Sequence, residues 1–258
     1  MTLSVADGLV TALSLAGAGP GGADLPLMNY GYEDGNLTTV TKPSGATTAF
    51  VYDDRRRVTA WIDSNGSRYD YVYDDRDRVV AEGGEAGHIQ IALSYSEPDP
   101  ERGHHTTTLT TPDGHATHHL FGPGCKLLAV TDPLGHTTRH AYDPRGNLLS
   151  RTDPLGLTTV FSYDEEGRLV RAVRPDGSEL HTVRGPFGLP EQVFGPDGSR
   201  MLHEYDERGN RTAVTDPAGF TTRYTYDQAG RLTSLTDAVG ATTHVVCDAA
   251  GLPVEVTD

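Results

Sequence analysis

The sequence predicts an all-β protein, an array of successive antiparallel β-hairpins with units of about 21 residues. Three observations predict this fold: evenly spaced glycines, a recurring Asp-Pro-x-Gly turn and a tyrosine slot that returns once per unit. From Gly146 to Gly251 the spacing of the turn glycines alternates between ten and eleven residues. Helices with their own connecting loops would not keep that count, whereas short strands between tight turns do.

The turns are recognisable from their residue types. In residues 143–146, Asp-Pro-Arg-Gly, the aspartate can cap its own turn and proline presets φ at the second position. The glycine accepts the positive φ that closes a type I turn with a bulge. The same recipe returns at residues 132–135, 153–156 and 216–219. We therefore expect two turns and two strands in each unit, each strand being about 20 Å long.

The position at which tyrosine returns once per unit, called the leading slot below, defines the extent of the array. Its intervals are 20, 21, 22 and 26 residues, followed by 21 six times in succession. The 26-residue interval contains a Pro-rich and charged stretch, so we expect a loop insertion near residues 96–105. Residues 1–28 are expected to be a degenerate N-terminal repeat or lead-in with a strand over 9–15, and residues 29–258 the repeat array. The slot is occupied by Tyr32, Tyr52, Tyr73, Tyr95, Phe121, Tyr142, Tyr163, Arg184, Tyr205, Tyr226 and Cys247.

The expected strands are semi-polar on both faces. In residues 221–226, Thr222, Tyr224 and Tyr226 would share one face, and the other face would carry threonines and Arg223. Such a sheet cannot bury a thick core. Its stability should come from cross-strand pairs of about 0.2 to 1 kcal/mol each, repeated along the array.

Composition excludes several classes of function. Hydrophobic residues make up 36% of the chain and the net charge is −15, so disorder is an alternative, but regular turn signals are not typical of disordered chains. The acidic balance argues against a nucleic-acid partner, and the basic run Arg55-Arg56-Arg57 lies beside two aspartates. No apolar run is long enough to span a bilayer, and the N-terminus lacks the basic region of a signal peptide. Cys125 and Cys247 occupy different slots of the repeat and suggest no disulfide framework.

The repeating unit resembles the YD repeat of the RHS (rearrangement hotspot) family. The best copies are Tyr163-Asp164-Glu165-Glu166-Gly167-Arg168-Leu169 and Tyr226-Asp227-Gln228-Ala229-Gly230-Arg231-Leu232, with Asn147 replacing the arginine in another copy. The resemblance covers about residues 25–258. It identifies a structural repeat signature, which comprises Tyr142, Asp143, Gly146, Gly156, Tyr163, Asp164, Gly167, Tyr205, Asp206, Gly209, Gly219, Tyr226, Asp227 and Gly230.

The resemblance implies a container rather than a catalyst. Proteins of this family form a curved, spiralling open sheet that closes into a hollow shell, and in bacterial members the shell encloses a C-terminal toxin. We therefore expect a non-catalytic wall segment whose partners are the remainder of a longer RHS protein and its toxin cargo. The core-closing motif and toxin domain of the family do not follow the last repeat at Asp258. By resemblance the protein is expected to be secreted or at the cell surface, and an isolated array is expected to self-associate edge to edge.

Other kinds of site have weaker support. The recurring aspartates could be calcium ligands, but each turn offers only one or two carboxylates, and capping explains them better. Paired histidines could bind a metal, although adjacent residues of a strand point to opposite faces. These histidines are His104, His105, His115, His118 and His119.

Carbohydrate or cell binding is the alternative function. A row of tyrosines on an exposed sheet could stack sugars, with Tyr71, Tyr73, Tyr224 and Tyr226 as the residues to test, although cross-strand packing is the favoured explanation of tyrosines in a fixed slot. No catalytic motif is present, so an enzyme is not expected and no catalytic, cofactor-binding or metal residue is assigned.

Overall fold

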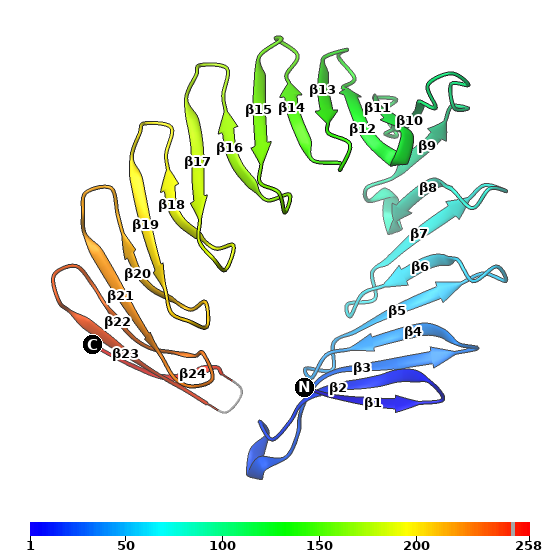
Figure 1. Cartoon of the computed structure of the whole chain (residues 1–258). Helices are drawn as coiled ribbons and strands as arrows, with labels where there is room; N and C mark the ends of the chain where they lie inside the picture. The colour runs from blue at the N-terminus through cyan, green and yellow to red at the C-terminus, as the bar shows by residue number, and fades with distance from the viewer. Residues whose placement is uncertain (249–250) are drawn as a thin grey trace. The chain divides into compact units, whose positions relative to one another are not determined.

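The structure, a computed structural model, describes residues 1–248 and 251–258. These residues form 24 β-strands and three short 3-10 helices, and the paired strands are antiparallel neighbours in sequence (Figure 1). The predicted all-β array of hairpins is confirmed, with strands throughout Tyr142 to Cys247. The chain divides into two compact units, Met1–His136 and Thr137–Asp258.

The first unit contains the first twelve strands and the three 3-10 helices. The strand expected over residues 9–15 is β2, and residues 96–104 connect β9 to β10. The strands are β1 (Thr2–Ala6), β2 (Leu9–Leu15), β3 (Leu25–Glu33), β4 (Asn36–Thr41), β5 (Thr47–Tyr52), β6 (Val58–Ile62), β7 (Arg68–Tyr73), β8 (Val79–Gly84), β9 (Ile91–Tyr95), β10 (His105–Thr110), β11 (Ala116–Gly122) and β12 (Lys126–Thr131). The helices are η1 (Pro20–Gly22), η2 (Glu85–Gly87) and η3 (Pro123–Cys125).

The second unit is more regular, because its leading slot recurs every 21 residues without an insertion. Each of its strands has five or six residues. They are β13 (Thr137–Tyr142), β14 (Leu148–Thr152), β15 (Thr158–Tyr163), β16 (Leu169–Val173), β17 (Glu179–Arg184), β18 (Pro190–Phe194), β19 (Arg200–Tyr205), β20 (Arg211–Thr215), β21 (Thr221–Tyr226), β22 (Leu232–Thr236), β23 (Thr242–Cys247) and β24 (Pro253–Thr257).

The predicted turn geometry is confirmed at Gly167. The Gly167 amide donates to the Asp164 carbonyl over 3.0 Å, and φ at Gly167 is +77°. The register of β15 and β16 shifts between Ser162 and Tyr163, which is the expected bulge. The bulge leaves Val170 of β16 as an extra residue without a partner in the register, which locally interrupts the alternation of faces. The same pair of turn and bulge recurs in the hairpins of unit 2.

The strands leave almost no residue fully covered. In β21 the side chains of Thr222, Tyr224 and Tyr226 are half-buried, whereas Arg223 and Thr225 are exposed, as the alternation predicts. Among the described residues the buried side chains are Ala60, Ala213 and Thr182. Each sheet face is therefore covered mainly by its own neighbouring side chains, and no second layer packs on it.

Some turns carry a non-glycine residue where the repeat has glycine, and Arg56 and Asp77 are two examples. Arg56 and Asp77 have φ values of +61° and +62°. A side chain costs about 1 to 2 kcal/mol in this left-handed conformation. Asp77 compensates through ion pairs to Arg55 and Arg57, of 2.6 and 2.8 Å. Arg56 has only its backbone hydrogen bond to Asp53 in the part of the chain described.

We expect Arg56→Gly to stabilise unit 1 by about 0.5 to 1 kcal/mol, because relief of left-handed strain exceeds the entropy that glycine adds to the unfolded chain. Gly66, in the following turn, has a φ of +86° and open space around its missing Cβ. Gly66→Ala is the matched control and should lose about 1 kcal/mol. Urea-unfolding midpoints measure both changes, and a lower midpoint for Arg56→Gly would contradict the strain.

Candidate functional site

The aspartate of each YD turn caps its own turn. Asp206 Oδ1 accepts the backbone amides of Arg208 and Asn210, over 2.9 and 2.8 Å. Together with a hydrogen bond from the Asn210 side chain to Oδ2, these donors hold the pKa of Asp206 below its usual range. Asp143, Asp164 and Asp227 cap their turns with the same Oδ1 contact to the residue four positions later. These carboxylates already have donors and do not converge as calcium ligands would.

The position four residues after the aspartate is occupied by arginine in some repeats and by asparagine in others, because both side chains can make the same contact. Either side chain donates an N–H to the second aspartate oxygen: Arg168 Nε to Asp164 Oδ2 over 2.8 Å, and Asn147 Nδ2 to Asp143 Oδ2 over 2.9 Å. Only arginine is long enough to reach the next turn as well. Arg231, for example, donates to the Asp248 carbonyl over 2.9 Å.

Where that residue is asparagine, an arginine two positions earlier makes the contact with the next turn. Arg145 Nη1 donates to the Glu165 carbonyl over 2.8 Å, and Arg208 Nη1 donates to the Gln228 carbonyl over 2.6 Å. Each of these turns is therefore joined to the next by one arginine. Sequence reasoning did not identify this exchange, although the paired occurrence of Arg145 with Asn147 and of Arg208 with Asn210 is visible in the sequence.

The leading tyrosine joins each hairpin to the hairpin before it. The ladder between β14 and β15 extends only from Thr152–Thr158 to Ser150–Val160, and beyond it the two strands run to separate turns. The tyrosine hydroxyl bridges that open end by donating to a backbone carbonyl at the start of the second strand of the preceding hairpin. Such bonds, of 2.6 to 3.0 Å to a carbonyl 15 residues earlier, are made by Tyr52 (Leu37), Tyr73 (Val58), Tyr163 (Leu148), Tyr205 (Pro190) and Tyr226 (Arg211).

Arg184 makes the same bridge where the slot lacks tyrosine. Its Nη2 donates to the Leu169 carbonyl, also 15 residues earlier, over 3.1 Å, and its Nη1 donates to the Gly188 carbonyl over 2.9 Å. The backbone acceptor is therefore the constant feature, and the donor can change. In unit 1 the turn arginine also covers the tyrosine ring, with Arg57 4.6 Å from the Tyr73 centroid.

Two histidines occupy the slot two residues before the leading residue in unit 2. The Nδ1 atoms of His140 and His203 are buried without a hydrogen-bond partner in the described structure. Burial, and then the positive charge of Arg151 beside His140 and of Arg211 beside His203, lower the pKa of each imidazole. Phe161 fills the same slot of another repeat, so the site accepts an uncharged ring.

The histidines around β10 and β11 are spread over separate partners. His105 and His119 stack on Phe121, with centroids 5.5 and 6.4 Å away, and His115 Nδ1 lies 2.7 Å from Asp113 Oδ2. His118 Nδ1 contacts the Thr108 hydroxyl at 3.0 Å, and the His104 carbonyl accepts a backbone bond. Within residues 1–248 and 251–258, no group of three or more His, Cys, Asp or Glu side chains converges to hold a metal. Both cysteines are free.

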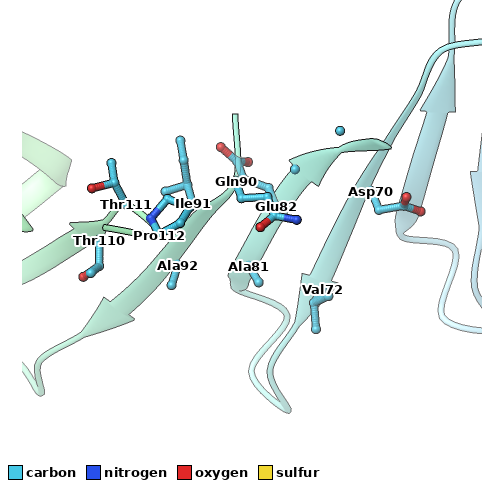
Figure 2. Close-up of a pocket in the computed structure, with 12 residues that line it drawn as sticks. Asp70, Val72, Ala81, Glu82, Gln90, Ile91, Ala92, Thr110, Thr111 and Pro112 are labelled. Atoms are coloured by element: carbon cyan, nitrogen blue, oxygen red, sulfur yellow. The ribbon is translucent and has the colours of Figure 1, made fainter. Parts of the chain in front are cut away.

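A groove of about 460 Å³ lies across β7, β8 and β9 in unit 1 (Figure 2). The pairing of β8 with β9 is short, limited to Ala81–Ala92 and Glu82–Ile91, so the sheet opens beside η2. A Cβ at Gly83 would lie 2.8 Å from the Gln90 side chain, so the glycine lets Gln90 approach. The groove holds two carboxylates but no nucleophile beside a base, and it offers no catalytic arrangement.

The fold and these contacts define a repeat protein whose recurring side chains join hairpins to one another. The family model for the RHS repeat matches residues 32–60, 126–155, 142–179, 205–243 and 229–258, which together cover just over half of the chain. The chain belongs to the RHS repeat family. No curated protein sequence matches it.

Solved structures of Tc toxins are similar to the chain. A Photorhabdus luminescens Tc holotoxin pore is 16% identical, with a TM-score of 0.42, over 86% of this chain and 16% of that one. TcdB2-TccC3 without its hypervariable C-terminal region is 15% identical, with a TM-score of 0.44, over 86% of this chain and 17% of that one. The chain thus spans less than a fifth of the length of these proteins. No helix among the described residues has the length and apolar character needed to cross a membrane.

Tyr73→Phe should destabilise the protein by about 1 kcal/mol, because it removes the hydroxyl bond to Val58 and leaves the ring under Arg57 in place. Tyr71→Phe, on the same strand, is the control and should change stability by a few tenths of a kcal/mol or less. Chemical denaturation of the two variants measures the difference. Equal losses would show that the hydroxyl bridge does not join the hairpins.

The half-buried His140 and His203, whose Nδ1 atoms lack a hydrogen-bond partner in the described structure, predict acid sensitivity. A lowered folded-state pKa means that the unfolded state binds protons more readily than the folded state. The stability that results is fully present above the ordinary histidine pKa of about 6.5, and it is lost as the pH falls below that value toward the lowered folded-state pKa. The denaturant concentration at the unfolding midpoint should therefore decrease as the pH is lowered from about 7.5 to about 5.5. In the double variant His140→Phe with His203→Phe, the unfolding midpoint should depend less on pH over this range. An unchanged pH profile would exclude these two residues as the cause.

Proposed function

We propose that the chain is a segment of the wall of an RHS shell that encloses a polypeptide cargo, a toxin carried by the longer protein. The observation that carries the proposal is the continuous joining of hairpins by tyrosine, aspartate and arginine in a chain of the RHS repeat family. A wall needs such lateral bonds, because a single-layer sheet has no core to hold it together. The protein that contains this wall is secreted or at the cell surface.

The repeat signature has a structural role in this proposal. Its tyrosines bridge hairpins, its aspartates cap turns, and its glycines supply positive φ. Strands β1 and β24 are exposed at every residue, and adjoining repeats of the longer protein would cover such edges. Without them, a second copy would do so.

Enclosure is tested by proteolysis of the longer protein that carries this chain. We expect the toxin segment inside it to be digested about tenfold more slowly, or slower still, than the isolated segment, since only a transiently opened wall would admit the protease. A variant with Tyr163→Ala, Tyr205→Ala and Tyr226→Ala loses three bridges between hairpins, and its toxin segment should be digested faster. Equal digestion of enclosed and isolated segments would reject the proposal.

Carbohydrate binding is a second candidate because of one aromatic cluster in unit 1. The rings of Trp61 and Tyr69 stack with centroids 5.9 Å apart, and Tyr71 meets Tyr69 edge-on at 5.4 Å. Half-exposed aromatic faces of this kind can stack on sugar rings. Of the other tyrosines considered for this role, Tyr73 is covered by Arg57 and Tyr224 lies under Arg211.

A further inference from the structure

Three grooves in unit 2 occupy equivalent places in different repeats, between a YD turn and the leading tyrosine of the next hairpin. Two of them are regular, with volumes of about 450 and 420 Å³. Each regular groove is lined by the turn aspartate and by the arginine that crosses to the next turn. The matching residues are Asp143, Arg145, Leu149, Phe161 and Tyr163 in one groove and Asp206, Arg208, Thr212, Tyr224 and Tyr226 in the other.

The third groove belongs to a turn that departs from the repeat at each of these polar positions. Gly185 stands where the aspartate is expected, Phe187 replaces the crossing arginine, and Glu191 replaces Leu149 or Thr212. Its volume is about 600 Å³, larger than either regular groove. The exchange removes the resident arginine, so the charged residues that line this groove are two carboxylates, Glu191 and Glu204, with no basic side chain beside them.

The glycine and the glutamate of this turn depend on each other. A Cβ built on Gly185 would lie 2.0 Å from Glu191 Oε1, so any other residue at 185 would displace the carboxylate. Glu191 itself is half-buried, and the described structure gives it no hydrogen bond or ion pair. Its carboxylate oxygens are therefore open to a hydrogen-bond donor from a partner molecule, which would displace water.

Three aromatic rings, those of Phe187, His203 and Tyr205, line part of the groove. The Tyr205 ring is fixed by its hydroxyl bond to the Pro190 carbonyl, of 3.0 Å, and His203 stacks on it at 6.5 Å. Burial lowers the pKa of His203, so at neutral pH its ring carries no charge that would repel a cation. Phe187 is 56% exposed at the mouth. Carboxylates beside aromatic faces, here Glu191 and the exposed Glu204, are the chemistry that recognises organic cations.

The arginines near this groove already have partners. Arg168 is paired with Asp164 and Glu166 over 2.8 and 2.9 Å. Arg184 donates to two backbone carbonyls, and Arg211 lies over the Tyr224 ring at 5.2 Å. None of the three lines the groove.

We propose that this groove binds a basic side chain, lysine or arginine, of a polypeptide partner. Glu191 accepts hydrogen bonds from the ammonium or guanidinium group, and the rings of Phe187, His203 and Tyr205 cover its aliphatic part. The partner's cation takes the place that Arg145 and Arg208 of the chain itself occupy in the regular grooves. This binding does not depend on whether the chain encloses a cargo.

The test uses the 258-residue protein labelled with 4-fluorophenylalanine, with the Phe187 signal assigned from a Phe187→Leu sample. Titration with N-acetyl-lysine methylamide or its arginine analogue should shift the Phe187 fluorine resonance saturably. The norleucine analogue, which has the same backbone without the charge, should not. Glu191→Gln should weaken binding about tenfold or more, as expected for loss of a charge-assisted hydrogen bond.

Glu207→Gln, which removes an exposed carboxylate from the following regular turn, is the matched control and should leave the affinity unchanged. The unfolding midpoints of both variants are measured first, so that a folding defect is recognised. Equal shifts with the norleucine analogue, unchanged affinity in Glu191→Gln, or no saturable shift with either basic probe would each overturn the proposal.

Discussion

The structure depends on one constraint: a single-layer sheet has no core, so adjacent hairpins must be joined through their own side chains. The hydroxyl of the leading tyrosine makes that connection, as in the bond from Tyr163 to the Leu148 carbonyl. It acts where the ladder between hairpins ends and the strands separate toward different turns. The acceptor is a backbone carbonyl, which every residue supplies, so Arg184 can replace tyrosine without loss of the bond.

The turn residues extend this connection along the ends of the strands. Aspartate organises its own turn, and an arginine from that turn reaches the next one. None of these bonds is strong by itself, since most are partly exposed and each contributes about 1 kcal/mol or less. Their repetition stabilises the sheet, because each repeat is held by its neighbours. This arrangement also explains why almost no residue other than Ala60 and Ala213 is fully buried.

Because the repeats of the array are regular, a turn that departs from their shared contacts stands out. Most departures from the repeat preserve a contact: asparagine replaces arginine at residues 147 and 210, and Arg145 and Arg208 then reach the next turn. The turn at 185–189 preserves none of these polar contacts and gains a carboxylate in an aromatic groove. This change does not restore a contact between turns, and it is the basis of our proposal that the groove binds a basic side chain of a partner.

The sequence by itself determined the hairpin array and its turns, because Asp-Pro-x-Gly spacing acts through local backbone preferences that need no distant contact. It also placed Tyr224 and Tyr226 on one face of their strand, and both are half-buried there. Only the tertiary structure decided what the leading tyrosines bind, since their acceptors lie 15 residues away across an open ladder. The groove at Glu191 could not be predicted from the sequence either. Its lining residues come from two neighbouring hairpins, and the distance between these hairpins is set by sheet packing rather than by residue spacing.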